Sequence, residues 1–168
     1  MRRALPLIAC ILALSACKRE LTPAEQAAAD AKAIAQVEAA NRSFAPPVAL
    51  DPQPITAADL QRAGLLDAGC AFEATGQTDP VLVARPKRAV MKFGRNLTSF
   101  ASDPGSPALP LDTWTHYVGK AGSLRIEAAR GEGDPTGQNR LEWPGKLTVT
   151  DEHDRIVYTS PGKLRCGA

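Results

Sequence analysis

From Cys70 to the end of the chain, short apolar runs are separated by Gly, Pro, Asn and Asp. This pattern is typical of antiparallel strands joined by tight turns, and it excludes a helical bundle. In one such run, Leu124 and Ile126 share one face of an extended chain, whereas Arg125 points to the other. We therefore predict a mainly β fold, a small antiparallel β-barrel or sandwich of about eight strands. The predicted strands are residues 71–75, 80–85, 88–93, 96–101, 114–118, 123–129, 139–150, 155–159 and 163–166.

Two Pro-Gly pairs fall within this region. Trp143 and Leu147 keep the same parity across Pro144-Gly145, which predicts one bent or bulged strand rather than two. The second pair, Pro161-Gly162, predicts the last turn of the chain, just before Cys166.

The first 16 residues have the pattern of a signal peptide, and we exclude them from the fold. Arg2 and Arg3 precede an apolar stretch that is shorter than the ~20 residues needed to cross a bilayer. Leu14-Ser15-Ala16-Cys17 closes this stretch and resembles the lipobox of bacterial lipoproteins. The resemblance implies that Cys17 receives a diacylglyceryl group, that the chain is cut before it, and that the new amine is acylated, with palmitate for example. The alternative is an ordinary secretory signal with a chance cysteine.

A lipid anchor of two or three acyl chains holds a protein stably on a membrane, whereas one chain is marginal. Lys18 follows Cys17, and by analogy with enterobacterial sorting the absence of Asp there favours the outer membrane. We expect a periplasm-facing anchor. Without Arg2 and Arg3, 18 basic residues balance 18 acidic ones, so the mature chain lacks the net positive charge of a nucleic-acid-binding protein.

The cysteines divide into two groups. Cys10 leaves with the signal peptide and Cys17 carries lipid, so Cys70 and Cys166 remain in an oxidising compartment. No His or third Cys lies near them in sequence to suggest a zinc site, and there is no Cys-x-x-Cys motif. We predict a structural disulfide that closes nearly the whole C-terminal domain; a metal pair or two free thiols are the alternatives.

Between the anchor and the strands, the chain is expected to form a tether, a linker and a leading helix. Residues 17–44 form the tether: Thr22, Pro23 and Glu25 predict the start of an Ala-rich helix that acts as a spacer or, alternatively, binds a partner. Residues 45–55 contain four prolines and are expected to be an extended, semi-rigid linker. The β-domain spans residues 56–168, with a short helix at its start.

Few residues indicate catalysis. His116 shares one face of its predicted strand with Trp114 and Val118, which favours a half-buried, hydrogen-bonded histidine over a catalytic base. His153 lies in an acidic segment, Asp151–Asp154, which favours a solvated turn over a weak cation site. The chain has no Gly-x-Ser-x-Gly, His-Glu-x-x-His or phosphate-loop motif, so we predict no catalytic residue, no metal and no cofactor.

One charged segment stands out. Between Asp79 and Asp103 every charged residue is positive. Strand alternation places Arg88 and Lys92 on one face of their strand, opposite Met91 and Phe93. Such a patch suits anionic lipid headgroups, lipopolysaccharide phosphates or an acidic envelope protein, and the alternative is a solvated face that prevents strand pairing. These candidate contacts are Arg85, Lys87, Arg88, Lys92 and Arg95.

The general plan of a lipobox followed by a disulfide-bracketed β-domain resembles that of membrane-bound inhibitors of c-type lysozyme over residues 70–168. That family implies a small β-barrel whose loop enters a lysozyme active site. Its Ser-Gly-x-x-Tyr loop and Phe-Trp-x-Lys-Gly segment have no counterpart here, so no inhibitory residue carries over. We expect a lipid-anchored outer-membrane protein with a non-catalytic binding or envelope-structural domain; an inhibitor of a hydrolase comes second and an enzyme third.

Overall fold

The computed structural model describes residues 21–42 and 45–167, so Cys17 and the predicted signal peptide lie outside the described residues. The chain divides into two units, Met1–Ala45 and Pro46–Ala168. The first contains α1 (Pro23–Arg42), which begins at the predicted position. The Thr22 amide donates to the Glu25 carboxylate at 2.8 Å, and the Glu25 amide donates to the Thr22 hydroxyl. No helix in the described part of the chain is long and apolar enough to cross a membrane.

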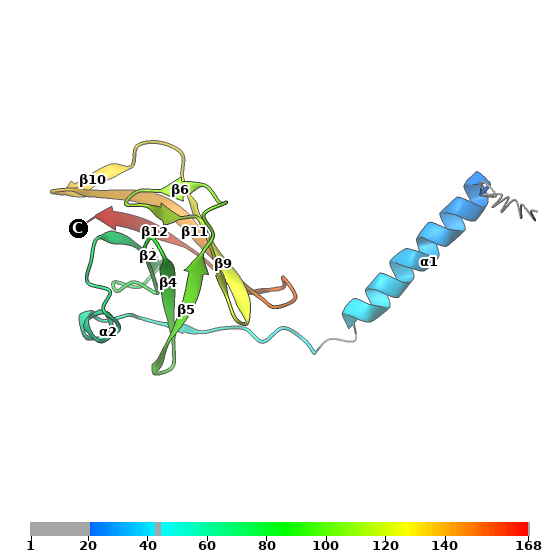
Figure 1. Ribbon diagram of the computed structural model, residues 1–168, viewed down its shortest axis with the longest axis horizontal. Coiled ribbons are helices and arrows are strands. Elements are labelled where there is room, and N and C mark those ends of the chain that lie inside the picture. The colour runs from blue at the N-terminus through cyan, green and yellow to red at the C-terminus, as the bar shows by residue number, and fades with distance from the viewer. Residues whose placement is uncertain (1–20, 43–44, 168) are drawn as a thin grey trace, which may run out of the picture. The chain divides into compact units, whose positions relative to one another are not determined.

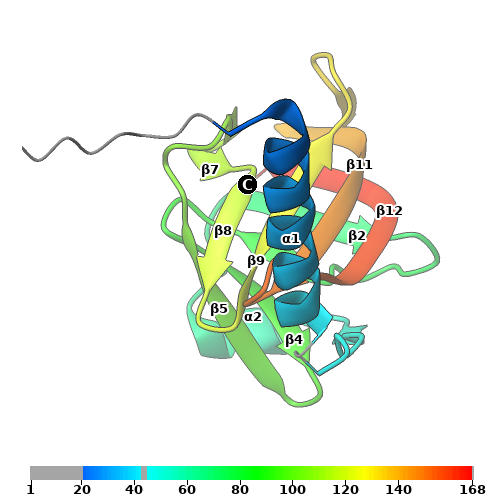
Figure 2. The same ribbon diagram turned by 90° about the vertical axis from the view of Figure 1, so that its right-hand side faces the viewer.

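The second unit is a closed antiparallel β-barrel, which confirms the predicted fold class (Figure 1). Eight strands form a ring in the order β4-β3-β2-β12-β11-β9-β8-β5, and β5 pairs with β4 to close it; Figure 2 shows several of them around the barrel. The eight are β2 (Gly69–Ala74), β3 (Leu82–Ala84), β4 (Arg88–Phe93), β5 (Asn96–Ser102), β8 (His116–Gly119), β9 (Gly122–Ala128), β11 (Arg140–Asp151) and β12 (Ile156–Gly167).

The barrel unit also contains shorter elements. A short helix, α2 (Ala57–Ala63), begins at the Thr56 capping box and ends at Gly64. The remaining strands are β1 (Pro52–Gln53), which pairs with β4, β6 (Ala108–Leu109) and β7 (Thr113–Trp114), which pair with each other, and β10 (Asp134–Gly137), which pairs with β11.

The interior of the barrel is filled by side chains. Phe72, Tyr117 and Leu164 are among the fully buried residues of one continuous apolar cluster. A second cluster lies around Ile55, Leu65 and the strand residues that they cover. The core thus occupies the inside of the barrel, which leaves its outer surface and its ends for binding a ligand.

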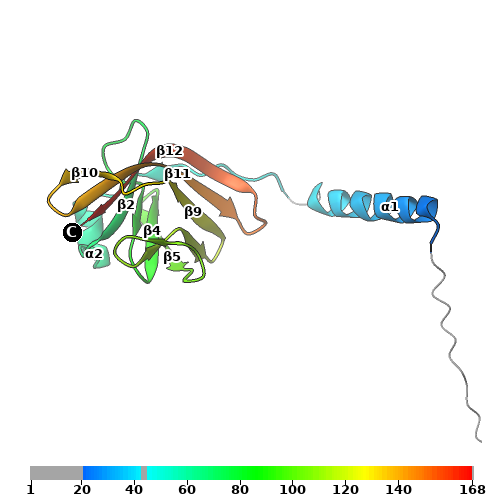
Figure 3. The same cartoon turned by 90° about the horizontal axis from the view of Figure 1, so that it is seen from above.

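The two longest strands, β11 and β12, bend together (Figure 3). Their Pro-Gly pairs face each other, with Gly145 opposite Gly162 in the ladder. A Cβ at either glycine would collide with a carbonyl oxygen of a neighbouring strand, Glu127 or Glu73. The single bent strand predicted across Pro144-Gly145 is confirmed, but the turn predicted at Pro161-Gly162 is wrong, because this pair continues β12 at the level where its partner also bends.

The second half of the Pro-rich segment lies on the barrel. The Leu50 amide donates to the Val157 carbonyl at 2.8 Å, and the Ile55 amide donates to the Pro80 carbonyl at 2.8 Å. Between them, β1 continues the sheet beside β4. Residues 50–55 therefore belong to the barrel unit, because the amides at both ends of this extended stretch find carbonyl partners there.

Candidate binding site at the arginine-rich end of the barrel

A disulfide marks one end of the barrel. Cys70 and Cys166 are directly opposite each other on β2 and β12, with their Cα atoms 4.0 Å apart. Both residues belong to the buried core. The predicted pair therefore joins two neighbouring strands, separated by 96 positions in sequence.

Two glycines lie beside the disulfide, and each leaves room for an arginine. Gly69 and Gly167 are cross-strand partners. A Cβ on Gly69 would lie 2.5 Å from a guanidinium nitrogen of Arg85, and a Cβ on Gly167 would lie 2.5 Å from Cγ of Arg140. Because neither glycine has a side chain, both arginines can lie against the backbone at this end of the barrel.

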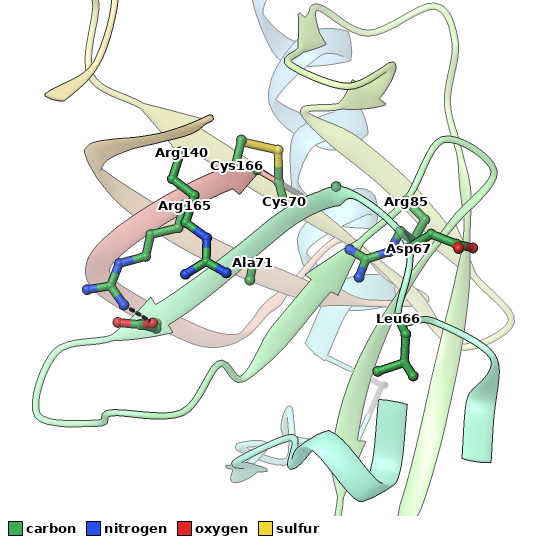
Figure 4. A pocket seen from close by; sticks show the side chains of 11 residues that line it. Leu66, Asp67, Cys70, Ala71, Arg85, Arg140, Arg165 and Cys166 are labelled. Atoms are coloured by element: carbon green, nitrogen blue, oxygen red, sulfur yellow. Dashed lines mark hydrogen bonds and ion pairs between the residues drawn. A yellow bond between two sulfur atoms is a disulfide. The ribbon is translucent and has the colours of Figure 1, made fainter. Parts of the chain in front are cut away.

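These side chains border a hollow of about 270 Å³, which we call the arginine hollow. In Figure 4, Arg140 and Arg165 lie on one side of the disulfide, and Arg85 and Leu66 lie on the other. The lining combines charged side chains with small residues. It consists of Leu66, Asp67, Gly69, Cys70, Ala71, Glu73, Arg85, Arg140, Arg165, Cys166 and Gly167.

The three arginines differ in how their charges are compensated. Arg165 forms ion pairs with Glu73 and Glu142, and the hydrogen bond to Glu142 raises the pKa of its guanidinium. Arg140 is exposed and has no hydrogen-bond or ion-pair partner among the described residues. Arg165 is thus held by protein carboxylates, whereas Arg140 is available to an external anion.

Arg85 is half-buried and held in place without a carboxylate. Its terminal nitrogens donate to the carbonyls of Leu65 at 2.6 Å and Ala84 at 2.9 Å, while its buried Nε has no partner. Burial lowers the pKa of this guanidinium, although it stays cationic at neutral pH. Within the described residues, no carboxylate lies within ion-pair distance of Arg85, so its charge too is incompletely compensated.

Two further hollows adjoin the arginine hollow. One, of about 600 Å³, shares Arg85 and Asp67 with it and extends over Lys87, Arg88 and Leu111. The other, of about 350 Å³, shares Arg140 with the arginine hollow and Leu111 with the larger one. Two of the three hollows, the arginine hollow and the 350 Å³ one, also border the disulfide. We call the part of the barrel around the three hollows, with the cations Arg85, Lys87, Arg88 and Arg140 that are outside ion pairs, the basic end of the barrel.

The structure separates the other two predicted basic residues from this site. Lys92 shares the outer face of β4 with Arg88, as alternation predicts, but its ammonium lies 2.7 Å from the Asp59 carboxylate and its side chain is only 19% exposed. Arg95 lies in the turn between β4 and β5 and borders none of the three hollows. Of the five predicted contacts, Lys92 and Arg95 thus lie apart from the three hollows, because Asp59 of α2 neutralises Lys92 and Arg95 lies in the β4–β5 turn.

Sequence reasoning missed Arg140, since it is far from the basic segment in sequence. The only local signal was the glycine next to each cysteine, Gly69-Cys70 and Cys166-Gly167, which marks a close approach of other atoms.

The two histidines lie elsewhere. The Nδ1 atom of His116 lies 2.9 Å from the Asp103 carboxylate, and this hydrogen bond lowers the pKa of Asp103. At the acidic turn, Asp151 accepts hydrogen bonds from the backbone amides of His153 and Arg155, so its carboxylate closes the turn itself. Among residues 21–42 and 45–167, no group of three or more His, Cys, Asp and Glu could hold a metal ion.

Comparison with known proteins identifies a family for this chain. No solved structure matches the chain. A family model described as a domain of unknown function, DUF6692, matches residues 13–158, from just before Leu14 to within β12. Because the match spans most of the sequence, the chain belongs to the DUF6692 family.

Proposed function

We propose that this protein is a lipid-anchored protein of the bacterial cell envelope whose barrel binds an anionic group without catalysing a reaction. The observation that carries the proposal is the pair Arg85 and Arg140, two cations without a carboxylate partner that lie against cross-strand glycines. A guanidinium presents donors in a planar fork that matches a carboxylate or a phosphate.

The fixed position of Arg85 also favours ligand binding. Two backbone carbonyls hold its guanidinium, so little side-chain freedom remains to be lost when an anion arrives. Its buried Nε lacks an acceptor, and a buried donor without an acceptor is costly.

The N-terminal part of the chain supports the anchor in this proposal. The lipobox-like segment ends at Cys17, and the family match includes it. Every side chain from 21 to 40 is exposed, including the two large apolar ones of α1, Ile34 and Val37. This suits a spacer between acyl chains in the outer membrane and a domain in the periplasm.

Anion binding can be measured on the chain from Lys18 to Ala168, which retains every described element. With inorganic pyrophosphate as the probe, we expect Arg140→Gln to weaken binding at low salt on the order of tenfold, because hydrogen bonds to charged groups contribute ~1.5–3 kcal/mol. The matched control is Arg95→Gln, which removes a cation outside the hollows. Equal affinities for the two variants, measured by calorimetry, would overturn the proposal.

A further inference from the structure

The turn between β6 and β7 adopts an unusual backbone conformation. The Thr113 amide donates to the Pro110 carbonyl at 3.3 Å, and the two residues between them, Leu111 and Asp112, have φ angles of 61° and 55°. Two consecutive left-handed residues define a type I′ turn, which Asn-Gly fills most easily. Asp tolerates this region, but Leu does not favour it.

Other contacts hold this strained turn in place. Thr113 is fully buried, and its hydroxyl donates to the Pro110 carbonyl at 2.8 Å. The Trp114 amide donates to the Tyr117 hydroxyl, which donates in turn to the Arg85 carbonyl at 3.1 Å. The turn is thereby connected to the segment that carries the cations of the basic end.

The result is an exposed leucine between two hollows. Leu111 is 42% exposed and borders both the 350 Å³ and the 600 Å³ hollows. A second leucine, Leu66, is 66% exposed and borders the arginine hollow. Backbone strain that persists around an exposed apolar side chain points to a role in contact with another molecule.

We infer that the basic end binds an acidic peptide segment of a partner, with carboxylates on Arg85 and Arg140 and an apolar side chain against Leu111. This inference rests on the anion-binding function proposed above and adds the class of ligand. The site combines cations outside ion pairs, concave surface and exposed leucines, and a peptide with both acidic and apolar side chains complements all three.

Two observations favour a peptide over the surface of the anchoring bilayer. Arg85 is half-buried within a hollow, where a single chain can reach more easily than a flat surface. Leu50, near the start of the barrel unit, also bonds to the Val157 carbonyl, about nine residues along β12 from Cys166. The basic end is therefore roughly 30 Å of strand away from the point where residues 50–55 meet β12.

The test uses the chain from Lys18 to Ala168 and three short blocked peptides. The first is Ala-Glu-Leu-Glu-Ala, the second replaces both Glu with Gln, and the third replaces Leu with Ser. We expect the first to bind best, with the Leu-to-Ser change weakening binding roughly fivefold in a salt-independent manner. The Glu-to-Gln change should weaken binding in a salt-dependent manner.

Two protein variants assign these preferences to residues. Leu111→Asn should remove the preference for Leu over Ser while keeping the preference for Glu over Gln; it should also raise the melting temperature, because Asn favours the left-handed region. Arg140→Gln should weaken the preference for Glu over Gln and leave the preference for Leu over Ser unchanged. Ile156→Asn, at an apolar residue that is 62% exposed and outside the three hollows, is the matched control and should change neither preference.

The outcomes separate the two proposals. If wild type prefers Glu over Gln but binds the Leu and Ser peptides equally, the peptide inference is overturned and anion binding stands. If neither preference exists and pyrophosphate does not bind, both fail. Tighter binding to phosphatidylglycerol vesicles than to the peptide, lost in Leu111→Asn, would assign the surface to a bilayer and overturn the inference.

Discussion

At the scale of single residues, the positive segment of the sequence shows what alternation can and cannot predict. Alternation correctly places Arg88 and Lys92 on the outer face of β4, with Met91 in the core. It cannot tell what covers that face. Here α2 covers it: Lys92 pairs with Asp59, and Arg88 donates to the Ala63 carbonyl at the end of the helix, at 2.7 Å.

Charge reversal at Lys92 is therefore expected to affect stability rather than ligand binding. Lys92→Glu places a second carboxylate beside Asp59, whose side chain is only 5% exposed, and should lower the melting temperature by several degrees. Arg95→Glu, in the exposed β4–β5 turn, is the control and should leave it nearly unchanged. Thermal unfolding followed by circular dichroism measures both, and similar values for the two variants would refute the assignment.

Acid should weaken the attachment of α2. The hydrogen bond from Lys92, followed by those from Thr56, holds the pKa of Asp59 well below its usual 3.8. A carboxyl group with a depressed pKa contributes stability that is fully present above its unfolded-state value and is lost as the pH falls toward its folded-state value. Below pH 4, the free energy of unfolding measured in urea should therefore fall less steeply with decreasing pH for Asp59→Asn than for wild type. Equal pH dependences of the two proteins would contradict this prediction.

At the scale of elements, capping motifs and strand alternation predicted most of the structure. The first helix begins at its predicted capping box, and the strand pattern after Cys70 predicts the ring of strands within a few residues. The exceptions involve proline. Pro161-Gly162 lies inside β12, and the segment at Pro52 forms β1, because each finds a partner strand that the local sequence does not reveal.

The packing of residues 50–55 on the barrel predicts a large effect of one small substitution. Ile55 is 1% exposed and lies against Leu65, Val83 and Val90. Ile55→Ala should lower the free energy of unfolding by about 2–4 kcal/mol, through lost burial and the cavity left behind. Val48→Ala, at a residue that is 78% exposed, should change it by less than about 0.5 kcal/mol. If residues 45–55 were only a linker, both variants would unfold like wild type.

At the scale of the whole molecule, the sequence indicates a barrel or sandwich but not where its charged ends lie. The basic end is assembled from the β3–β4 loop, the start of β11 and the segment after α2, which are distant in sequence. Register brings Gly69 and Gly167 together only after β12 has paired with β2. The site thus depends on tertiary pairing, which local patterns cannot supply.

The disulfide is expected to be a major source of stability. Replacing both Cys70 and Cys166 with alanine should cost about 2–5 kcal/mol, the usual effect of losing a native disulfide from a small secreted domain. Denaturant unfolding of the variant and of wild type gives the difference. As a direct check, thiol titration of the unfolded, non-reduced protein should find neither Cys70 nor Cys166 reactive.

The proposed anchor makes a separate prediction about the full-length precursor. Cys17→Ser removes the acyl acceptor, so metabolic labelling with palmitate should be lost and the protein should remain a soluble or uncleaved precursor. Cys10→Ser, in the apolar part of the signal, is the matched control and should be labelled like wild type. Label that persists on the Cys17→Ser protein would end the lipoprotein proposal.

The place of β12 in the ring sets the order in which the molecule can be completed. β12 lies between β11 and β2, and it is the last strand in the sequence. Until residues 156–167 have been synthesised and delivered to the compartment where folding occurs, β2 and β11 each present an open edge. Open edges pair with other chains, so a translation product that stops before Ile156 is expected to aggregate rather than to form a smaller barrel.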